Sequence, residues 1–147
     1  MRVSQILPTK RSGIVRVPAT ATVLTAITLM QREHVGAVLV LDEDDRLLGV
    51  LSERDVVYGF ASDAQALLQK PVLEVARKNP PTGALEDTVQ SVMELMTATR
   101  ARHVPIVRFG RVIGVVSIGD VVKSRLDEKT VENTVLQEIA RAQFFAG

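Results

Sequence analysis

Two serine–aspartate pairs have the spacing best suited to chemistry in this chain. The stretches GVLSERD (Gly49 to Asp55) and GVVSIGD (Gly114 to Asp120) each place an aspartate three residues after a serine. A serine at this spacing can cap a helix N-terminus, and the acid can bond back to the serine backbone. A helix N-terminus also presents unpaired N–H groups and a partial positive charge, so it stabilises a phosphate. Two interpretations, a helix cap and a ligand-binding site, therefore stay open.

Basic groups near the two motifs are candidates for binding an anion. Arg102 and His103 stand directly before an apolar segment of the second half, and His34 and Val35 are aligned with them in the first half. Arg54, inside the first motif, either reaches a phosphate or stays solvated. Since the second half alone offers both an arginine and a histidine, we expect its motif to form the stronger site.

The chain offers little for catalysis. His34 and His103 are its only histidines and it has no cysteine, so we find neither a catalytic triad nor a metal cluster. The acidic run DEDD (Asp42 to Asp45) lacks the glycine and the terminal glutamate of an EF-hand loop and is expected to be a solvated turn. The dinucleotide-binding fingerprint and the Walker A sequence are absent. We therefore expect a binding protein without catalytic residues, catalytic cofactor or metal.

The motifs belong to two copies of a longer pattern. TVLTAITLM (Thr22 to Met30) is matched by TVQSVMELM (Thr88 to Met96) at an offset of 66 residues, and both have apolar residues at helical spacing. After each come two apolar runs joined by a turn, which predicts a β-hairpin. With Ala37 placed opposite Pro105 the offset becomes 68, and a turn three residues shorter in the second copy returns it to 65 at the motifs.

These patterns predict an α+β fold of two β-α-β-β-α repeats with pseudo-twofold symmetry, their sheets packed against each other. We assign residues 1–65 to the first repeat, 66–126 to the second and 127–147 to a C-terminal helical tail. The first repeat opens with a β-branched strand at residues 14–17, whereas NPPTG (Asn79 to Gly83) at the same place in the second is a poor strand sequence. The tail either folds back onto the core or meets a second subunit through one apolar stripe: Val131, Val135, Ile139 and Ala142.

Composition narrows the class of protein. The 147 residues are 46% hydrophobic and 24% charged, as in ordinary soluble globular proteins. No apolar run approaches the roughly 18 residues that cross a bilayer, and the N-terminus lacks the apolar segment of a secretory signal. A net charge of +1 gives no overall field for capturing nucleic acid. We expect a cytoplasmic protein with no membrane or nucleic-acid partner.

The paired motifs, each behind a matching helix and hairpin, resemble a tandem pair of cystathionine β-synthase (CBS) domains of the stand-alone type, a Bateman module. HVPIV (His103 to Val107) adds to this resemblance, which covers roughly residues 1–126. It implies regulatory binding of AMP, ADP, ATP, NAD or S-adenosylmethionine in clefts between the halves. It also implies a homodimer, because the family typically pairs two modules into a flat disc.

The resemblance assigns roles to the residues above. Asp55 and Asp120 would bond the ribose hydroxyls, with Ser52 and Ser117 beside them. The groups that would meet the phosphates are Arg54, Arg102, His103 and His34. None of the five aromatic residues falls at the expected base-contact positions, so the adenine slot is expected to be aliphatic. The residues expected to form it are Val15, Val17, Val35 and Ala37.

Two functions follow from these residues. The first is a non-catalytic regulator that binds an adenine nucleotide and signals to a separate, unknown effector protein by a packing change. Such a change requires that the ligand bind the two arrangements with different affinity. The second is an interaction or scaffold protein whose Ser-x-x-Asp motifs are only helix caps. Titration with nucleotides distinguishes the two.

Overall fold

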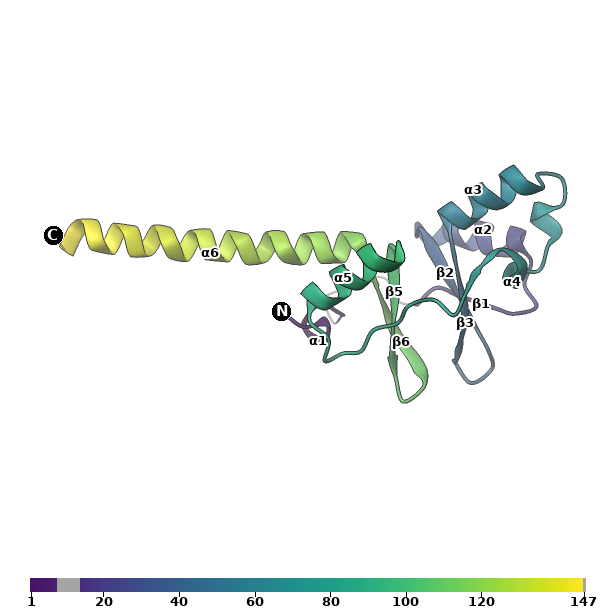
Figure 1. The fold of residues 1–147 in the computed structure, drawn as a ribbon, viewed down its shortest axis with the longest axis horizontal. Coiled ribbons are helices and arrows are strands. Elements are labelled where there is room, and N and C mark those ends of the chain that lie inside the picture. Colours follow the sequence, from purple (N-terminus) through teal and green to yellow (C-terminus); the bar gives the residue numbers. More distant parts are fainter. Residues whose placement is uncertain (8–13, 147) are drawn as a thin grey trace.

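The computed structural model describes residues 1–7 and 14–146, with the side chains described as far as residue 143. Each half contains a helix, a β-hairpin and a second helix in that order (Figure 1). The first half also opens with a short strand. Its elements are β1 (Arg16–Pro18), α2 (Val23–Glu33), β2 (Ala37–Leu41), β3 (Leu47–Ser52) and α3 (Glu53–Ser62). Those of the second half are α5 (Val89–Thr99), β5 (His103–Arg108), β6 (Arg111–Ser117) and α6 (Ile118–Ala146).

The first helix of each half begins and ends in the same way. Thr22 and Thr88 cap α2 and α5 by accepting a hydrogen bond from the backbone N–H three residues later. Both helices end at a residue in the left-handed conformation, His34 with φ 55° and Arg100 with φ 54°. Because these two residues turn the chain into β2 and β5, they occupy equivalent places in the two halves.

The two sheets differ in size. β1 is parallel to β2, β2 is antiparallel to β3, and β3 is antiparallel to β4 (Arg77–Lys78), whereas β5 and β6 form a two-stranded sheet. The place of a first strand in the second half is taken by a single parallel bridge between Gly83 and Ile106. Proline has no backbone N–H to donate, which explains why the NPPTG segment makes a bridge and not a strand.

Three apolar clusters hold the molecule together. One lies between the second sheet and α5 with the start of α6, around Val104, Ile106 and Val121. Another lies between the first sheet and α2, around Val38 and Leu51. The third joins the two sheets and contains Leu39, Leu41, Val50 and Val112. The predicted α+β fold of two repeats with packed sheets is therefore confirmed.

Packing crosses the boundaries assigned from the sequence. The short helix α1 (Val3–Ile6) contributes Val3 and Ile6 to the cluster of the second half. Conversely, Val72 and Ala76, which follow the 3₁₀ turn at Leu67–Gln69, lie in the cluster of the first half together with α4 (Val72–Val75). The ranges 1–65, 66–126 and 127–147 thus remain a prediction based on the repeat, and each half is completed by a segment from outside its range.

Strand pairing corrects the alignment of the two repeats. Ala37 pairs with Ser52, and His103 pairs with Ser117, so Ala37 and His103 are equivalent at an offset of 66. The expected offset of 68 in this strand is wrong, and the second hairpin is shorter by one residue. An error of two residues keeps every side chain on the same face of a strand, so the apolar pattern could not reveal it.

The last helix does not fold back onto the core. α6 runs for 29 residues, begins in the motif of the second half and extends away from the body of the molecule (Figure 1). The expectation that the tail folds back is therefore wrong. Among the helices of the described part of the chain, none has both the length and the apolar character needed to span a bilayer.

Candidate functional site

Both serine–aspartate pairs form complete capping boxes. The backbone N–H of Ser52 donates to Oδ2 of Asp55 at 2.9 Å, and the N–H of Asp55 donates to Oγ of Ser52 at 3.4 Å. Ser117 and Asp120 repeat this arrangement at 2.8 and 3.2 Å. The boxes fix each carboxylate at the N-terminus of α3 or α6, where the helix dipole favours a bound anion.

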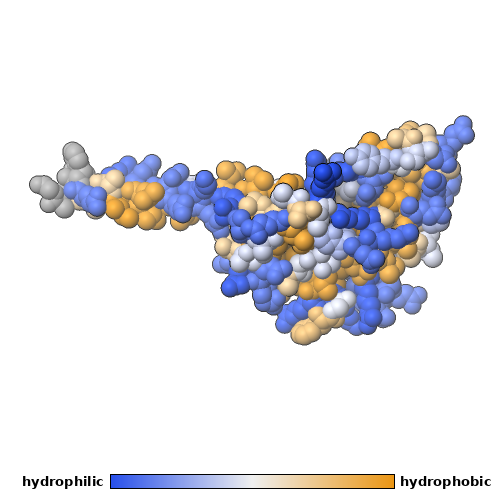
Figure 2. Space-filling view, in the orientation of Figure 1, coloured by the Kyte–Doolittle hydropathy of each residue, from blue (hydrophilic) through white to orange (hydrophobic). Residues whose placement is uncertain are grey.

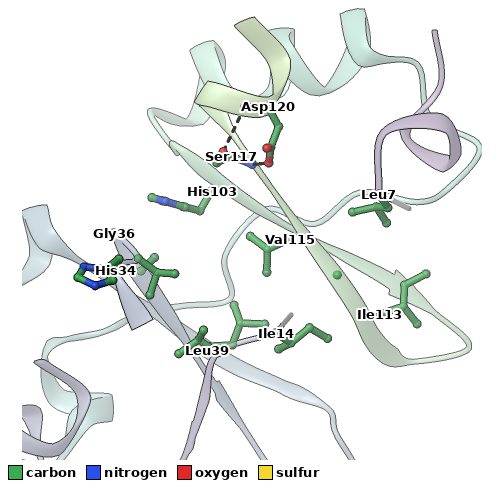
Figure 3. Close-up of a pocket in the computed structure, with 14 residues that line it drawn as sticks. Leu7, Ile14, His34, Gly36, Leu39, His103, Ile113, Val115, Ser117 and Asp120 are labelled. Carbon is green, nitrogen blue, oxygen red and sulfur yellow. Dashed lines mark hydrogen bonds between the residues drawn. The ribbon is translucent and has the colours of Figure 1, made fainter. Parts of the chain in front are cut away.

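One cleft, here called the Asp120 cleft, has a volume of about 480 Å³ and opens beside Ser117 and Asp120. Figure 3 shows the polar groups Ser117, Asp120 and His103 at one end, and the apolar side chains of Ile14, Leu39 and Val115 at the other. The motif comes from the second half, whereas Ile14 and Leu39 come from the first. A ligand in this cleft would therefore touch both halves.

A second cleft, here called the Asp55 cleft, has a volume of about 590 Å³ and opens beside Ser52 and Asp55. Its opposite wall comes from the second half, through Arg102, Pro80 and Pro81. Pro80 and Pro81 occupy the places that Ile14 and Val15 have in the Asp120 cleft, at the same offset of 66 residues. The two clefts are thus related by the pseudo-twofold symmetry of the repeats.

Their charges differ. Four arginines line the Asp55 cleft, opposite two carboxylates from Glu53 and Asp55; they are Arg54, Arg77, Arg100 and Arg102. Among the described residues of the Asp120 cleft the ionisable side chains are His34, His103 and Asp120. Since a surplus of arginine favours phosphate groups, the Asp55 cleft is the better receptor for a strongly anionic ligand.

Two of these arginines also join the halves. Nη1 of Arg54 donates to the carbonyl of Arg100 at 3.1 Å, and Nη1 of Arg77 donates to the carbonyl of Thr99 at 2.9 Å. Both carbonyls lie at the C-terminus of α5, where unpaired acceptors and the negative end of the helix dipole favour a cation. The floor of the Asp55 cleft is therefore tied to the opposite repeat.

Sequence comparison decides the family. The model of the CBS domain matches residues 3–62 and again residues 72–127. The chain belongs to the CBS-domain family. The predicted recognition as a pair of CBS domains is confirmed, and the two matches correspond to the two halves described above.

Solved structures share this CBS pair. The CBS-domain containing protein ATU1752 from Agrobacterium tumefaciens is 37% identical, with a TM-score of 0.79 over 84% of this chain and 98% of that one. The CBS domain protein PAE2072 from Pyrobaculum aerophilum, solved in complex with AMP, is 32% identical, with a TM-score of 0.72 over 82% of this chain and 89% of that one.

Curated relatives differ in length. An uncharacterized 17.7 kDa protein of Acidianus ambivalens is 32% identical over 133 residues, which is 89% of this chain and 77% of the relative. The CBS domain-containing protein CBSCBSPB1 of Arabidopsis thaliana is 31% identical over 107 residues, or 73% of this chain, but these residues make up only 20% of that relative. The CBS pair thus occurs both in chains of similar size and within longer ones.

The clefts of the CBS pair bring together most of the residues singled out in the sequence. Ser52, Arg54, Asp55, Arg102 and His103 line the Asp55 cleft. The Asp120 cleft is lined by Ser117 and Asp120 together with the predicted His34, Val15, Val35, Ala37 and His103. His103 lines both clefts and lies beside Gly36, where an added Cβ would be 3.5 Å from its Nε2.

Val17 is the exception among the predicted residues. Its side chain is buried in the core of the first half and lines neither cleft. Val15 and Val17 point to the same side of the strand, but Val17 lies two residues, or about 7 Å, further along it and pairs with Val40. Its assignment to the adenine slot is therefore wrong.

The expected partnership of Arg102 with the second motif is also wrong. The carbonyl of Arg102 accepts a hydrogen bond from Ile118 N–H at 2.8 Å, next to that motif, but its side chain lines the Asp55 cleft. The corrected register also places Gly36 and Ala37, not His34 and Val35, opposite Arg102 and His103. The positive charge thus accumulates beside the first motif.

Several lining residues were not predicted. Tyr58 lines the Asp55 cleft one helical turn after Asp55, so the absence of aromatic residues from the base-contact positions does not hold for this cleft. Its spacing of three residues from Asp55 was a usable signal. Pro80 and Pro81 were hidden by their unlikeness to Ile14 and Val15, and Arg77 lies outside the repeated elements.

Proposed function

We propose that this CBS pair is a non-catalytic regulatory protein that binds adenine nucleotides in both clefts. One observation carries the proposal: each cleft joins the Ser-x-x-Asp helix start of one repeat to the apolar wall of the other. Binding of AMP by the related PAE2072 supports the choice of an adenine nucleotide. A protein named CBSX2, 25% identical with a TM-score of 0.73, was also solved in complex with AMP.

In the proposed complex the aspartate accepts hydrogen bonds from the ribose hydroxyls. The capping box engages Oδ2 of Asp55, so Oδ1 of that carboxylate is outside the box and is the atom expected to meet the sugar. The base lies between the apolar walls, which are Ile14 and Val15 in one cleft and Pro80 and Pro81 in the other. The phosphates lie at the helix N-terminus.

The two clefts are expected to differ in the nucleotide they prefer. The four arginines of the Asp55 cleft favour ATP or ADP, or the diphosphate of NAD, over AMP. The described lining of the Asp120 cleft carries less positive charge and suits AMP. A protein built in this way responds to the ratio of the nucleotides and thus senses the energy state of the cell.

The signal is proposed to be a change in how the two halves pack. Each cleft contains groups from both halves, so a bound nucleotide stabilises the arrangement in which these groups are closest. The output passes to a separate effector protein in the cytoplasm, and the protein acts as a homodimer. The alternative is a scaffold whose Ser-x-x-Asp boxes act only as helix caps, and the capping hydrogen bonds described above are compatible with it.

Thermal unfolding in the presence of AMP, ATP and NAD tests the proposal. A nucleotide at about one hundred times its Kd stabilises the folded state by about 2.7 kcal/mol, which raises the Tm of a chain of this length by about 5–10 °C. Guanosine nucleotides serve as the matched control. If no adenine nucleotide raises the Tm at millimolar concentration, the regulatory proposal fails and the scaffold alternative stands.

A further inference from the structure

The outer part of α6 has no contact partner in its own chain. The helix is anchored by the buried Val121 and Ser124, and Oε1 of Glu128 lies 3.1 Å from the amino group of Met1. Beyond this point every described side chain, from Lys129 to Gln143, is exposed. We call residues 129–143 the arm.

The arm carries an apolar stripe that continues the buried face of the same helix. From Val121 and Ser124 the spacing of three and four residues leads through Glu128 to the arm, where the stripe consists of Val131, Val135, Ile139 and Ala142. Figure 2 shows apolar side chains along the projecting helix. An isolated helix of this length is barely stable in water, so packing against a partner is needed to hold it.

We propose that the arm pairs with the arm of a second copy of this chain, antiparallel, with Val135 facing its own counterpart. The inference specifies one contact of the homodimer proposed above, and it does not depend on nucleotide binding. Residues equally far on either side of Val135 then face each other, so Val131 packs against Ile139 of the second copy. Such a twofold contact uses the same surface on both chains and closes upon itself.

The charges along the arm favour this direction. In the antiparallel pair Asp127 of one chain lies within one helical turn of Arg141 of the second copy, on the same side of the seam, and twofold symmetry makes this pair twice. The two helix dipoles also oppose each other, which is the favourable arrangement. Both opposite-charge pairs flank the apolar seam, as charges do in paired helices.

The parallel arrangement places like charges together. The two Glu128 side chains would face each other in the seam itself, and Asp127 would lie beside Glu132 of the second copy. The body-proximal ends of both helices would also have to lie at the same end of the pair. The sequence of the arm thus selects the antiparallel pair with a second copy over the parallel one.

Disulfide trapping tests the direction, because the natural chain has no cysteine. Mixing Val131→Cys with Ile139→Cys chains under mild oxidation should give a covalent dimer that contains one chain of each kind. Val131→Cys alone should remain uncrosslinked, since in the antiparallel pair its counterparts lie far apart. Efficient crosslinking of Val131→Cys to itself, or no crosslinking in the mixture, would overturn the proposal.

Sedimentation of the full chain tests whether the stripe holds the dimer. Val131→Glu should raise the dimer dissociation constant at least tenfold, whereas Leu126→Glu, equally exposed but on another face of the helix, should not. Asp127→Arg or Arg141→Asp alone should weaken the dimer, and the double exchange should restore it. Unchanged association of Val131→Glu, or association only with another protein, contradicts the pairing. Adenine nucleotides titrated into the same variants should bind as in the natural chain, so failure of this inference is distinguishable from failure of the regulatory proposal.

Discussion

At the scale of single residues, the aspartates at the helix starts take part in folding and are also proposed to bind a ligand. One oxygen of Asp55 holds the serine backbone and hydroxyl, both at 2.9 Å, and the other is outside that network. A cap of this kind contributes about 1 kcal/mol to stability. Asparagine keeps an acceptor for the cap but loses the negative charge, so Asp→Asn variants separate the two roles.

Arg102 provides a test of which residues share a cleft. Arg102→Ala should weaken nucleotide binding about fivefold in an Asp120→Ala background, where only the Asp55 cleft remains, because the exposed arginine contributes about 1 kcal/mol. In an Asp55→Ala background the same change should have little effect. Calorimetry on the double variants measures both values.

The control for Arg102 is Arg108→Ala. Arg108 lies at the far end of β5, with its guanidinium 5.1 Å from the ring centre of Phe109, and it lines neither described cleft. An effect of Arg102→Ala confined to the Asp120 cleft would restore the partnership expected from the sequence and contradict the geometry described above.

Motif residues could be predicted from the sequence, whereas their partners could not. Ser52 and Asp55 follow from spacing alone, since a capping box is a local interaction. Which cleft receives the Arg102 side chain depends on how two repeats face each other, and no local pattern records that. Val17 fails for a related reason: period two fixes its face but not its depth along the strand.

At the scale of elements, β3 and β4 approach each other closely at a glycine. A Cβ added to Gly49 would lie 3.0 Å from the backbone carbonyl oxygen of Arg77. A backbone atom cannot move aside cheaply, so Gly49→Ala should lower the free energy of unfolding by about 1–3 kcal/mol. Denaturant unfolding measures this change.

Gly119→Ala is the matched control. Gly119 lies in the first turn of α6, and an added Cβ would make only an ordinary contact of 3.6 Å with Oγ of Ser117. Because alanine restricts the unfolded chain and favours the helix, this variant should be neutral or more stable by up to about 1 kcal/mol. Equal effects of the two substitutions would mean that contact with Arg77 does not explain Gly49.

Most elements followed from the sequence because their signals are local. The threonine caps and apolar spacing predicted α2 and α5, and the paired apolar runs predicted both hairpins. β4 escaped prediction, since the two residues Arg77 and Lys78 form a strand only because β3 offers a free edge. Tertiary context of this kind overrides local propensity.

At the scale of the whole molecule, neither half is complete without the other. The helix at Val3–Ile6 packs in the core of the second half, and Val72 with Ala76 packs in the first. Both clefts lie between the halves, so a ligand that fills one changes the energy of their contact. This exchange could not be predicted, because a repeat in sequence does not specify which half a connecting segment covers.

Calorimetric titration of four chains with ATP and with AMP tests the central claim most directly. The natural chain should bind nucleotide at two sites, Asp55→Ala and Asp120→Ala should each lose one, and the double variant should bind none. Each lost ribose contact should weaken its site at least tenfold, as expected for a hydrogen bond to a charged group. Thermal unfolding of the Asp→Asn variants checks that the fold survives. Binding by the double variant with natural affinity and stoichiometry would contradict the account.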